Sequence, residues 1–207
     1  MKAKWRTVST MLTMNYMIAK IDPKKGECRL GPLWNVPRDH QIRFGVSRAA
    51  NFPSDAEFRM DEDFPKDLTL ADVLESDTRA LVASARLREL LEGIPGALFQ
   101  NEILPVKIIN HKGRAERSPY FIISQLDHPP CLDENQSVGR RSPINPEHFQ
   151  SMKKMVLDEI RIDPKLMLFR VAQFPIVPIM RRDLALKLRA ERLTGISFHE
   201  IEGYRFL

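Results

Sequence analysis

Short apolar stretches separated by turn-forming residues recur along the chain. Runs of about four to eight residues rich in Val, Ile, Phe and Tyr are typical of β-strands. The first, at residues 11–18, is followed by the turn signal of residues 22–26. The sequence predicts further strands at residues 81–82, 103–109, 120–126, 166–171, 174–180 and 196–199. The turn-forming residues 111–113 favour an antiparallel pairing of the two strands beside them.

A helical spacing of leucines begins directly after the second of these strands. Leu87, Leu90 and Leu91 fall on one face of a helix, with charged residues around them. Ser84 suits the N-terminal cap, because its hydroxyl can accept a hydrogen bond from a free backbone N–H. Gly93 suits the end of the helix, because glycine tolerates left-handed backbone geometry. The simplest role for the three leucines is core packing.

A second helix is predicted at residues 183–192, with Leu184 and Leu188 on one face and Gly195 as its cap. Residues 152–162 fit either a helical stripe or a strand, and the pattern leaves both open. Together these elements predict an α+β protein, made of a mostly antiparallel sheet with two or three packed helices.

The length of 207 residues suits a single domain that spans residues 1–207. Residues 28–65 lack a clear hydrophobic period, so residues 1–65 are expected to form a loop-rich N-terminal part. Residues 70–207 hold most of the predicted elements. Neither a low-complexity linker nor a repeat of fixed period separates the two parts.

Composition narrows the class of protein. The chain is 43% apolar and 29% charged, with a formal net charge of +5. This basic excess is compatible with nucleic-acid binding, but the long basic clusters with interleaved aromatics that such binders usually show are absent. The two cysteines, Cys28 and Cys131, fit a reducing cytosol and do not make a disulfide framework. No apolar run reaches the roughly 20 residues that span a bilayer, and the N-terminal segment is interpreted as a strand rather than an export signal.

Cys131 is the first candidate for chemistry, because His128 lies three residues before it and Asp133 two residues after it. A thiol beside an imidazole can act as a nucleophile, and the three side chains could also bind a metal. Pro129-Pro130 stiffens the connection, and no second histidine or paired cysteine motif accompanies it. A half-buried structural cysteine is therefore the favoured interpretation. Glycine-rich phosphate loops and the GxSxG, HExxH and CxxC motifs are absent, so neither a metal nor a cofactor is expected.

Asp133 and Glu134 could form an acid/base pair if they lie in a loop, but adjacent residues of a strand point to opposite faces. A turn in which Asp133 accepts backbone hydrogen bonds is the favoured interpretation. The basic pairs Arg140-Arg141 and Arg181-Arg182 are expected on a solvated face or at the rim of a protein interface.

Arg170 directly follows Phe169 in a predicted strand. Strand alternation places the two side chains on opposite faces, so a buried Phe169 implies that Arg170 faces solvent or a partner. An ion pair with a carboxylate on the sheet surface is the simpler alternative.

Six segments, taken in order, resemble one known family. Their order and approximate spacing are similar to those of the Imm11-type immunity proteins of bacterial polymorphic toxin systems, also called the DUF1629 family. The similarity covers about residues 70–200, the family-like core within residues 70–207. The segments are residues 81–92, 102–106, 120–123, 131–137, 168–170 and 193–195.

This resemblance implies a cytoplasmic, non-catalytic protein that binds and neutralises the toxin domain of its cognate system. Many antidotes to nucleases are acidic, whereas this chain is basic, so mimicry of nucleic acid is disfavoured. The toxin would instead present an acidic surface, or aromatic and aliphatic anchors would carry the contact. Loops carry recognition on rigid scaffolds, which points to the loop of residues 128–137 and its neighbours. The toxin-binding candidates are His128, Asp133, Glu134, Ser137, Arg140, Arg141 and Arg170.

Three other functions remain as alternatives to the immunity protein. One is a small hydrolase or transferase that uses Cys131 with His128, or Asp133 with Glu134. A second is a basic nucleic-acid binder, whose affinity would fall steeply with salt. A third is a structural or regulatory protein. The sequence does not specify the toxin or the oligomeric state.

Overall fold

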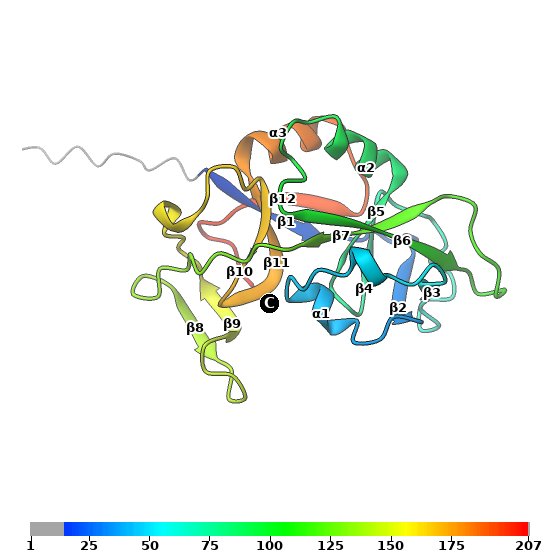
Figure 1. Ribbon diagram of the computed structural model, residues 1–207, viewed down its shortest axis with the longest axis horizontal. Coiled ribbons are helices and arrows are strands. Elements are labelled where there is room, and N and C mark those ends of the chain that lie inside the picture. The colour runs from blue at the N-terminus through cyan, green and yellow to red at the C-terminus, as the bar shows by residue number, and fades with distance from the viewer. Residues whose placement is uncertain (1–14, 207) are drawn as a thin grey trace, which may run out of the picture.

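The computed structural model describes residues 15–206 as a mostly β protein with three sheets. Six strands close into a barrel in the order β2-β3-β6-β7-β5-β4, in the right half of Figure 1. The barrel strands are β2 (Arg29–Trp34), β3 (Glu57–Met60), β4 (Val73–Ser76), β5 (Leu81–Ser84), β6 (Asn101–Ile109) and β7 (Tyr120–Gln125).

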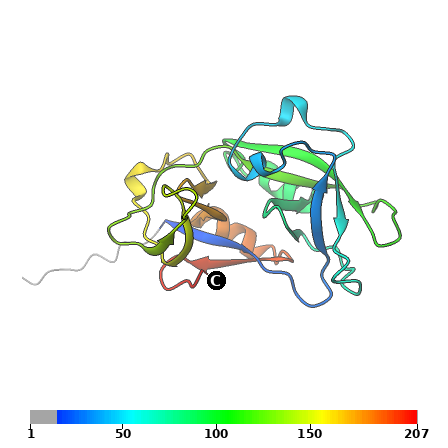
Figure 2. The ribbon, with the colours of Figure 1, turned by 90° about the horizontal axis from the view of Figure 1, so that it is seen from below.

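A four-stranded antiparallel sheet with the order β10-β11-β1-β12 lies beside the barrel. Its strands are β1 (Tyr16–Ile21), β10 (Leu168–Val171), β11 (Phe174–Arg181) and β12 (Ile196–Glu200). The third sheet is a hairpin of β8 (Val138–Arg141) and β9 (Phe149–Lys154). In Figures 1 and 2 this hairpin and the β6–β7 loop of the barrel lie at opposite ends of the molecule.

The helices are short, and two of them cover the junction between barrel and sheet. Helices α2 (Ala85–Glu92) and α3 (Arg182–Ala190) lie side by side along the top of Figure 1. Their buried leucines share one core cluster with residues of β1, β5 and β7. The remaining helical turns are α1 (His40–Arg43), η1 (Ala49–Asn51) and η2 (Glu159–Arg161).

Two further core clusters complete the packing. One fills the barrel with side chains such as Phe58, Leu74 and Ile122. The other lies between the four-stranded sheet and the segment around β8 and β9, where Phe169 and Cys131 are fully buried. The barrel and the four-stranded sheet therefore share one core at their junction, and each also has one of its own.

The loop before β12 docks against the barrel. Thr194 Oγ1 donates to Asp72 Oδ2 at 3.0 Å, and the backbone N–H of Val73 donates to the Thr194 carbonyl at 3.1 Å. Gly195 has φ of +73°, and a Cβ there would lie 1.9 Å from the Val73 carbonyl oxygen. Gly195 is thus required by a close backbone approach, and Glu191, not Gly195, caps α3.

The predicted fold class is wrong. The chain is not an α+β protein with a mostly antiparallel sheet and packed helices, because a closed barrel and two further sheets make most of its regular structure. Barrel closure depends on the parallel pairs β2–β4 and β3–β6, which join segments far apart in the sequence. Local hydrophobic patterns show individual strands but not such long-range pairings.

Several local predictions are confirmed. Ser84 caps α2 by accepting a hydrogen bond from the backbone N–H of Leu87 at 3.3 Å. Strands β6 and β7 pair antiparallel. Gly93 ends α2, but with φ of −73°, so left-handed geometry is not the reason. The ambiguous stretch of residues 152–162 begins in strand β9 and ends in the single turn η2.

The first predicted strand, at residues 11–18, is described only from residue 15 onward, where β1 begins at Tyr16. Residues 11–14 lie outside the described residues. Within the N-terminal part, β1 is an inner strand of the four-stranded sheet, and β2 and β3 belong to the barrel. The loops that connect these three strands contain α1 and η1.

Candidate functional site

His128 begins the loop that the sequence singles out, and it is half-buried. Its Nε2 lies 3.1 Å from the Gln125 carbonyl oxygen, which can only accept, so Nε2 carries the hydrogen. Burial, and then the charge of Arg170, lower the pKa of His128 to about 4. His128 is therefore neutral at pH 7, and its bond to Gln125 ties the start of the loop to the end of β7.

Cys131 is fully buried in the core cluster under the hairpin. Burial raises the pKa of its thiol to about 12, so the nucleophilic thiolate is not available near neutral pH. The ring nitrogen of His128 is bonded to Gln125 rather than to this thiol. The structure therefore does not form the Cys131–His128 pair that a cysteine-dependent enzyme would need.

Asp133 and Ser137 hold the turn between Cys131 and β8. Asp133 Oδ1 accepts from the backbone N–H groups of Asn135 and Gln136 at 3.0 and 3.1 Å. The side-chain amide of Gln136, which donates to Asp133 Oδ2, and then these backbone bonds lower the pKa of Asp133. Ser137 Oγ accepts from the backbone N–H of Val156 at 3.0 Å. These bonds agree with a turn and not with a free catalytic carboxylate.

Glu134 does not act with Asp133. Its carboxylate is exposed and forms an ion pair with Arg141 of β8. An acid/base couple of Asp133 and Glu134 therefore has no geometric basis in the described structure. Among residues 15–206, no three His, Cys, Asp or Glu side chains gather as a metal-binding group.

Arg170 is buried, with 2% of its surface exposed, so the expectation that it faces solvent or a partner is wrong. It also lacks the expected carboxylate: its guanidinium donates to Gln125 Oε1 at 2.8 Å and to the Arg79 carbonyl at 2.7 Å. Two further bonds reach the carbonyls of Pro175 and Ile176. Burial lowers the pKa of Arg170. Side chains on both faces of β10 are buried. The alternation of side chains along a strand predicts which residues share a face, but not whether both faces are buried.

The basic pair Arg140-Arg141 lies on the projecting β8–β9 hairpin, and both residues are exposed. Arg141 is tied to the hairpin itself, because it lies over the Phe149 ring at 4.3 Å and donates to the Pro146 carbonyl at 3.0 Å. Arg140 makes no side-chain hydrogen bond or ion pair within residues 15–206. Of the two, Arg140 is the guanidinium available to a partner.

The sequence did not predict that helix α1 lies beside the hairpin. Phe44, at the end of α1, stacks on His148 of the hairpin turn, with ring centroids 6.1 Å apart and planes 16° from parallel. The Arg43 guanidinium lies 5.0 Å from the centroid of the Phe44 ring. Phe44 and His148 are separated by about half the chain, and no local signal joins them.

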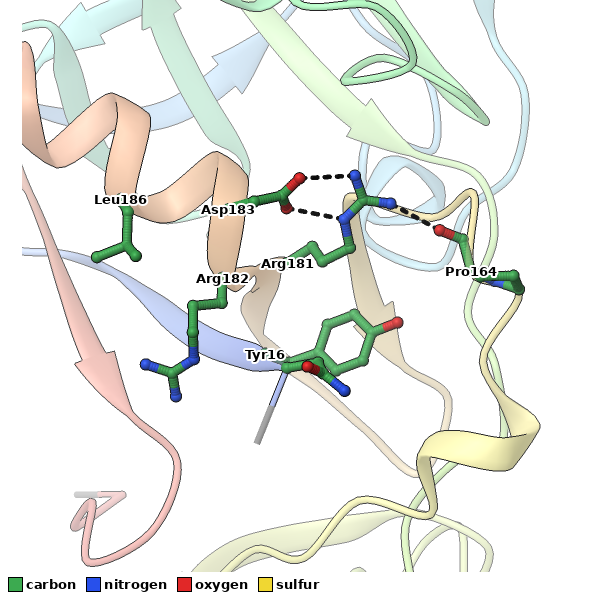
Figure 3. Close-up of a pocket in the computed structure, with 7 residues that line it drawn as sticks. Tyr16, Pro164, Arg181, Arg182, Asp183 and Leu186 are labelled. Atoms are coloured by element: carbon green, nitrogen blue, oxygen red, sulfur yellow. Dashed lines mark hydrogen bonds and ion pairs between the residues drawn. The ribbon is translucent and has the colours of Figure 1, made fainter. Parts of the chain in front are cut away.

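A hollow of the described surface lies elsewhere, at the start of α3 (Figure 3). It measures about 500 Å³ and opens beside Tyr16, Arg181 and Leu186. Arg181 bridges the carboxylate of Asp183, through two bonds of 2.8 Å, and the Pro164 carbonyl. The charged groups of Arg181 and Asp183 thus pair with each other, and none of the toxin-binding candidates lines this hollow.

A comparison with models of protein families matches residues 15–203 to the Imm11 immunity protein family. The chain belongs to this family. The sequence resemblance is thereby confirmed, and the Imm11 match extends it to β1, β2 and β3 of the N-terminal part. The curated proteins include no match to this chain. No helix within residues 15–206 is long and apolar enough to cross a membrane.

Proposed function

We propose that this Imm11 protein binds the toxin domain of its cognate polymorphic toxin system in the cytoplasm and neutralises it without catalysis. Membership of the immunity family is the observation that carries this proposal. Two features of the site support a binding role. The thiol of Cys131 is buried, and the carboxylates of Asp133 and Glu134 are engaged in a turn and an ion pair.

The toxin-binding candidates divide into two groups. We assign direct contact to Arg140, whose guanidinium has no partner within residues 15–206, and to the exposed ion pair of Glu134 and Arg141. The second group positions these side chains without contacting the toxin. The hydrogen bonds of His128, Asp133 and Ser137 hold the loop, and that of Arg170 joins β10 to β7.

A rescue assay tests the proposal. The toxin domain encoded beside this protein is expressed from an inducible promoter in a bacterial host, with and without the Imm11 protein. We expect growth to be restored and a complex to co-purify. An inactive toxin variant controls for the burden of expression. Continued killing at good soluble expression of the Imm11 protein contradicts the proposal for that pair.

A further inference from the structure

The exposed side chains of the hairpin and of α1 with its following loop form one surface, here called the hairpin–α1 surface. We define it by the exposed residues Phe44, Val46, Arg140 and Ile144 and by the partly exposed His148. The stacked rings of Phe44 and His148 join its two parts. Ile144 and His148 lie in the same turn, which the backbone N–H of Ser142 closes by donating to the His148 carbonyl at 2.8 Å.

Both segments that form this surface have more basic than acidic residues. The hairpin, residues 138–154, has four basic residues and one acidic residue, and the α1 segment, residues 38–48, has three basic residues and one acidic residue. The excess in the two segments together equals the formal net charge of +5 of the whole chain. The remaining residues sum to zero formal charge, and each of the two segments has a net positive charge of its own.

Large apolar side chains are exposed among these cations. Ile144, at the hairpin turn, is 94% exposed, and Phe44 and Val46 are 41% and 43% exposed. An isoleucine so exposed at the tip of a projecting hairpin has no role in the core. Apolar anchors with charged residues at the rim are typical of protein–protein interfaces.

The hairpin is held firmly enough to present this surface. Phe149 and Met152 of β9 are buried in the core beneath it, and a Cβ on Gly139 would lie 2.5 Å from the Ser151 carbonyl oxygen. The backbone N–H of Phe149 donates to the Gln173 carbonyl at 2.7 Å, which ties β9 to the turn between β10 and β11. A preorganised surface loses less entropy on binding than a mobile loop does.

We propose that the hairpin–α1 surface docks an acidic face of the toxin domain, with Ile144 in an apolar recess bordered by carboxylates. This inference rests on the proposed immunity function and specifies its binding face and partner chemistry. A nucleic-acid ligand fits less well, because the most exposed side chain at the tip is an aliphatic isoleucine, which has no ring on which a base could stack.

The test measures the affinity of the purified protein for a catalytically inactive toxin domain by calorimetry at low and at physiological salt. Ile144→Asp removes the apolar anchor and adds a like charge to an acidic partner. Its matched control is Ile160→Asp on η2, because Ile160 is 96% exposed and lies outside the hairpin–α1 surface. We expect Ile144→Asp to weaken binding at least about tenfold and Ile160→Asp less than about twofold.

A second pair of variants tests the charge. Arg140→Glu with Lys153→Glu reverses two exposed cations of the hairpin. Arg114→Glu with Arg117→Glu makes the same change in the β6–β7 loop at the other end of the molecule (Figure 1). We expect the hairpin variant alone to lose at least about tenfold in affinity and most of the salt dependence. Circular dichroism and thermal unfolding check that every variant is folded.

The outcomes separate the two proposals. No binding by the wild-type protein, together with failed rescue, overturns the immunity function and this inference with it. Wild-type binding that survives both hairpin variants, or that falls equally with the controls, overturns the docking surface alone. A labelled oligonucleotide serves as a further probe. Binding of the oligonucleotide that is lost in the hairpin variants while toxin binding is kept assigns the surface to nucleic acid and overturns the inference.

Discussion

Arg170 Nε donates a hydrogen bond of 2.8 Å to Gln125 Oε1, which joins strand β10 of the four-stranded sheet to strand β7 of the barrel. The same guanidinium also donates to the Arg79 carbonyl in the turn between β4 and β5. One buried cation thus ties the two β units together through uncharged oxygen atoms. Such a group is stable only while its hydrogen bonds are complete, so it holds the junction in one geometry.

Replacement of Arg170 should destabilise the fold. Arg170→Met keeps the length of the side chain but leaves the carbonyls of Arg79 and Pro175 without their donor. We expect a loss on the order of 3 kcal/mol in the free energy of unfolding, measured with chemical denaturant. Arg140→Met, at an exposed position, should change this free energy by less than about 0.5 kcal/mol. Equal stabilities would contradict the role of Arg170 at the junction.

Burial of His128 should make stability depend on pH below neutrality. The lowered pKa of about 4 means that the unfolded chain binds a proton before the folded protein does. The stabilisation is therefore complete above about pH 6.5 and is lost as the pH falls toward 4. Between pH 7 and 4.5 we expect the wild type to lose about 2 kcal/mol more than His128→Gln does. Parallel stability curves for the two proteins would show that His128 does not titrate in this way.

The close approach at Gly195 predicts a large effect of adding one methyl group. Gly195→Ala combines a left-handed φ of +73° with a Cβ 1.9 Å from the Val73 carbonyl oxygen. Gly203 has a similar φ of +75° but open space around its Cβ position. We expect Gly203→Ala to cost about 1 kcal/mol and Gly195→Ala at least twice as much. Equal shifts in thermal midpoint would mean that the loop before β12 accommodates the methyl group freely.

The two thiols should be unreactive in the folded protein. Cys28 and Cys131 are both free and buried, and burial raises the pKa of each thiol to about 12. DTNB at pH 8 should label neither cysteine until denaturant is added, and the rate should follow local opening. Cys131→Ala should still protect against the toxin in the rescue assay. A folded Cys131→Ala variant that no longer protects would revive the cysteine-dependent alternative.

The parts of the fold that the sequence predicts are those fixed by local interactions. The helix capped by Ser84 and the antiparallel pair β6–β7 depend on residues close together in the chain. The barrel also needs the parallel pairing of Glu57 with Lys107, which no local pattern encodes. The fold class was wrong for this reason.

The candidate site was likewise predicted correctly only where its contacts are local in the sequence. The turn at Asp133 follows from its own side chain, which bonds the backbone two and three residues on. The burial of Arg170 depends on Gln125 and Arg79, from other elements, which cover its face of the strand. The stack of Phe44 on His148 likewise requires the whole fold. Tertiary contacts of this kind decide which candidates reach the surface.

The most direct test of the central claim is a titration of the active toxin domain with purified Imm11 protein. Stoichiometric binding predicts that toxin activity falls linearly and reaches zero near one Imm11 protein per toxin. It also predicts that activity returns when the complex is separated under denaturing conditions and the toxin is refolded. Inactivation by far smaller amounts of Imm11 protein, or a toxin that stays inactive after separation, would indicate catalysis and contradict the account. Undiminished toxin activity at an excess of Imm11 protein would also contradict it.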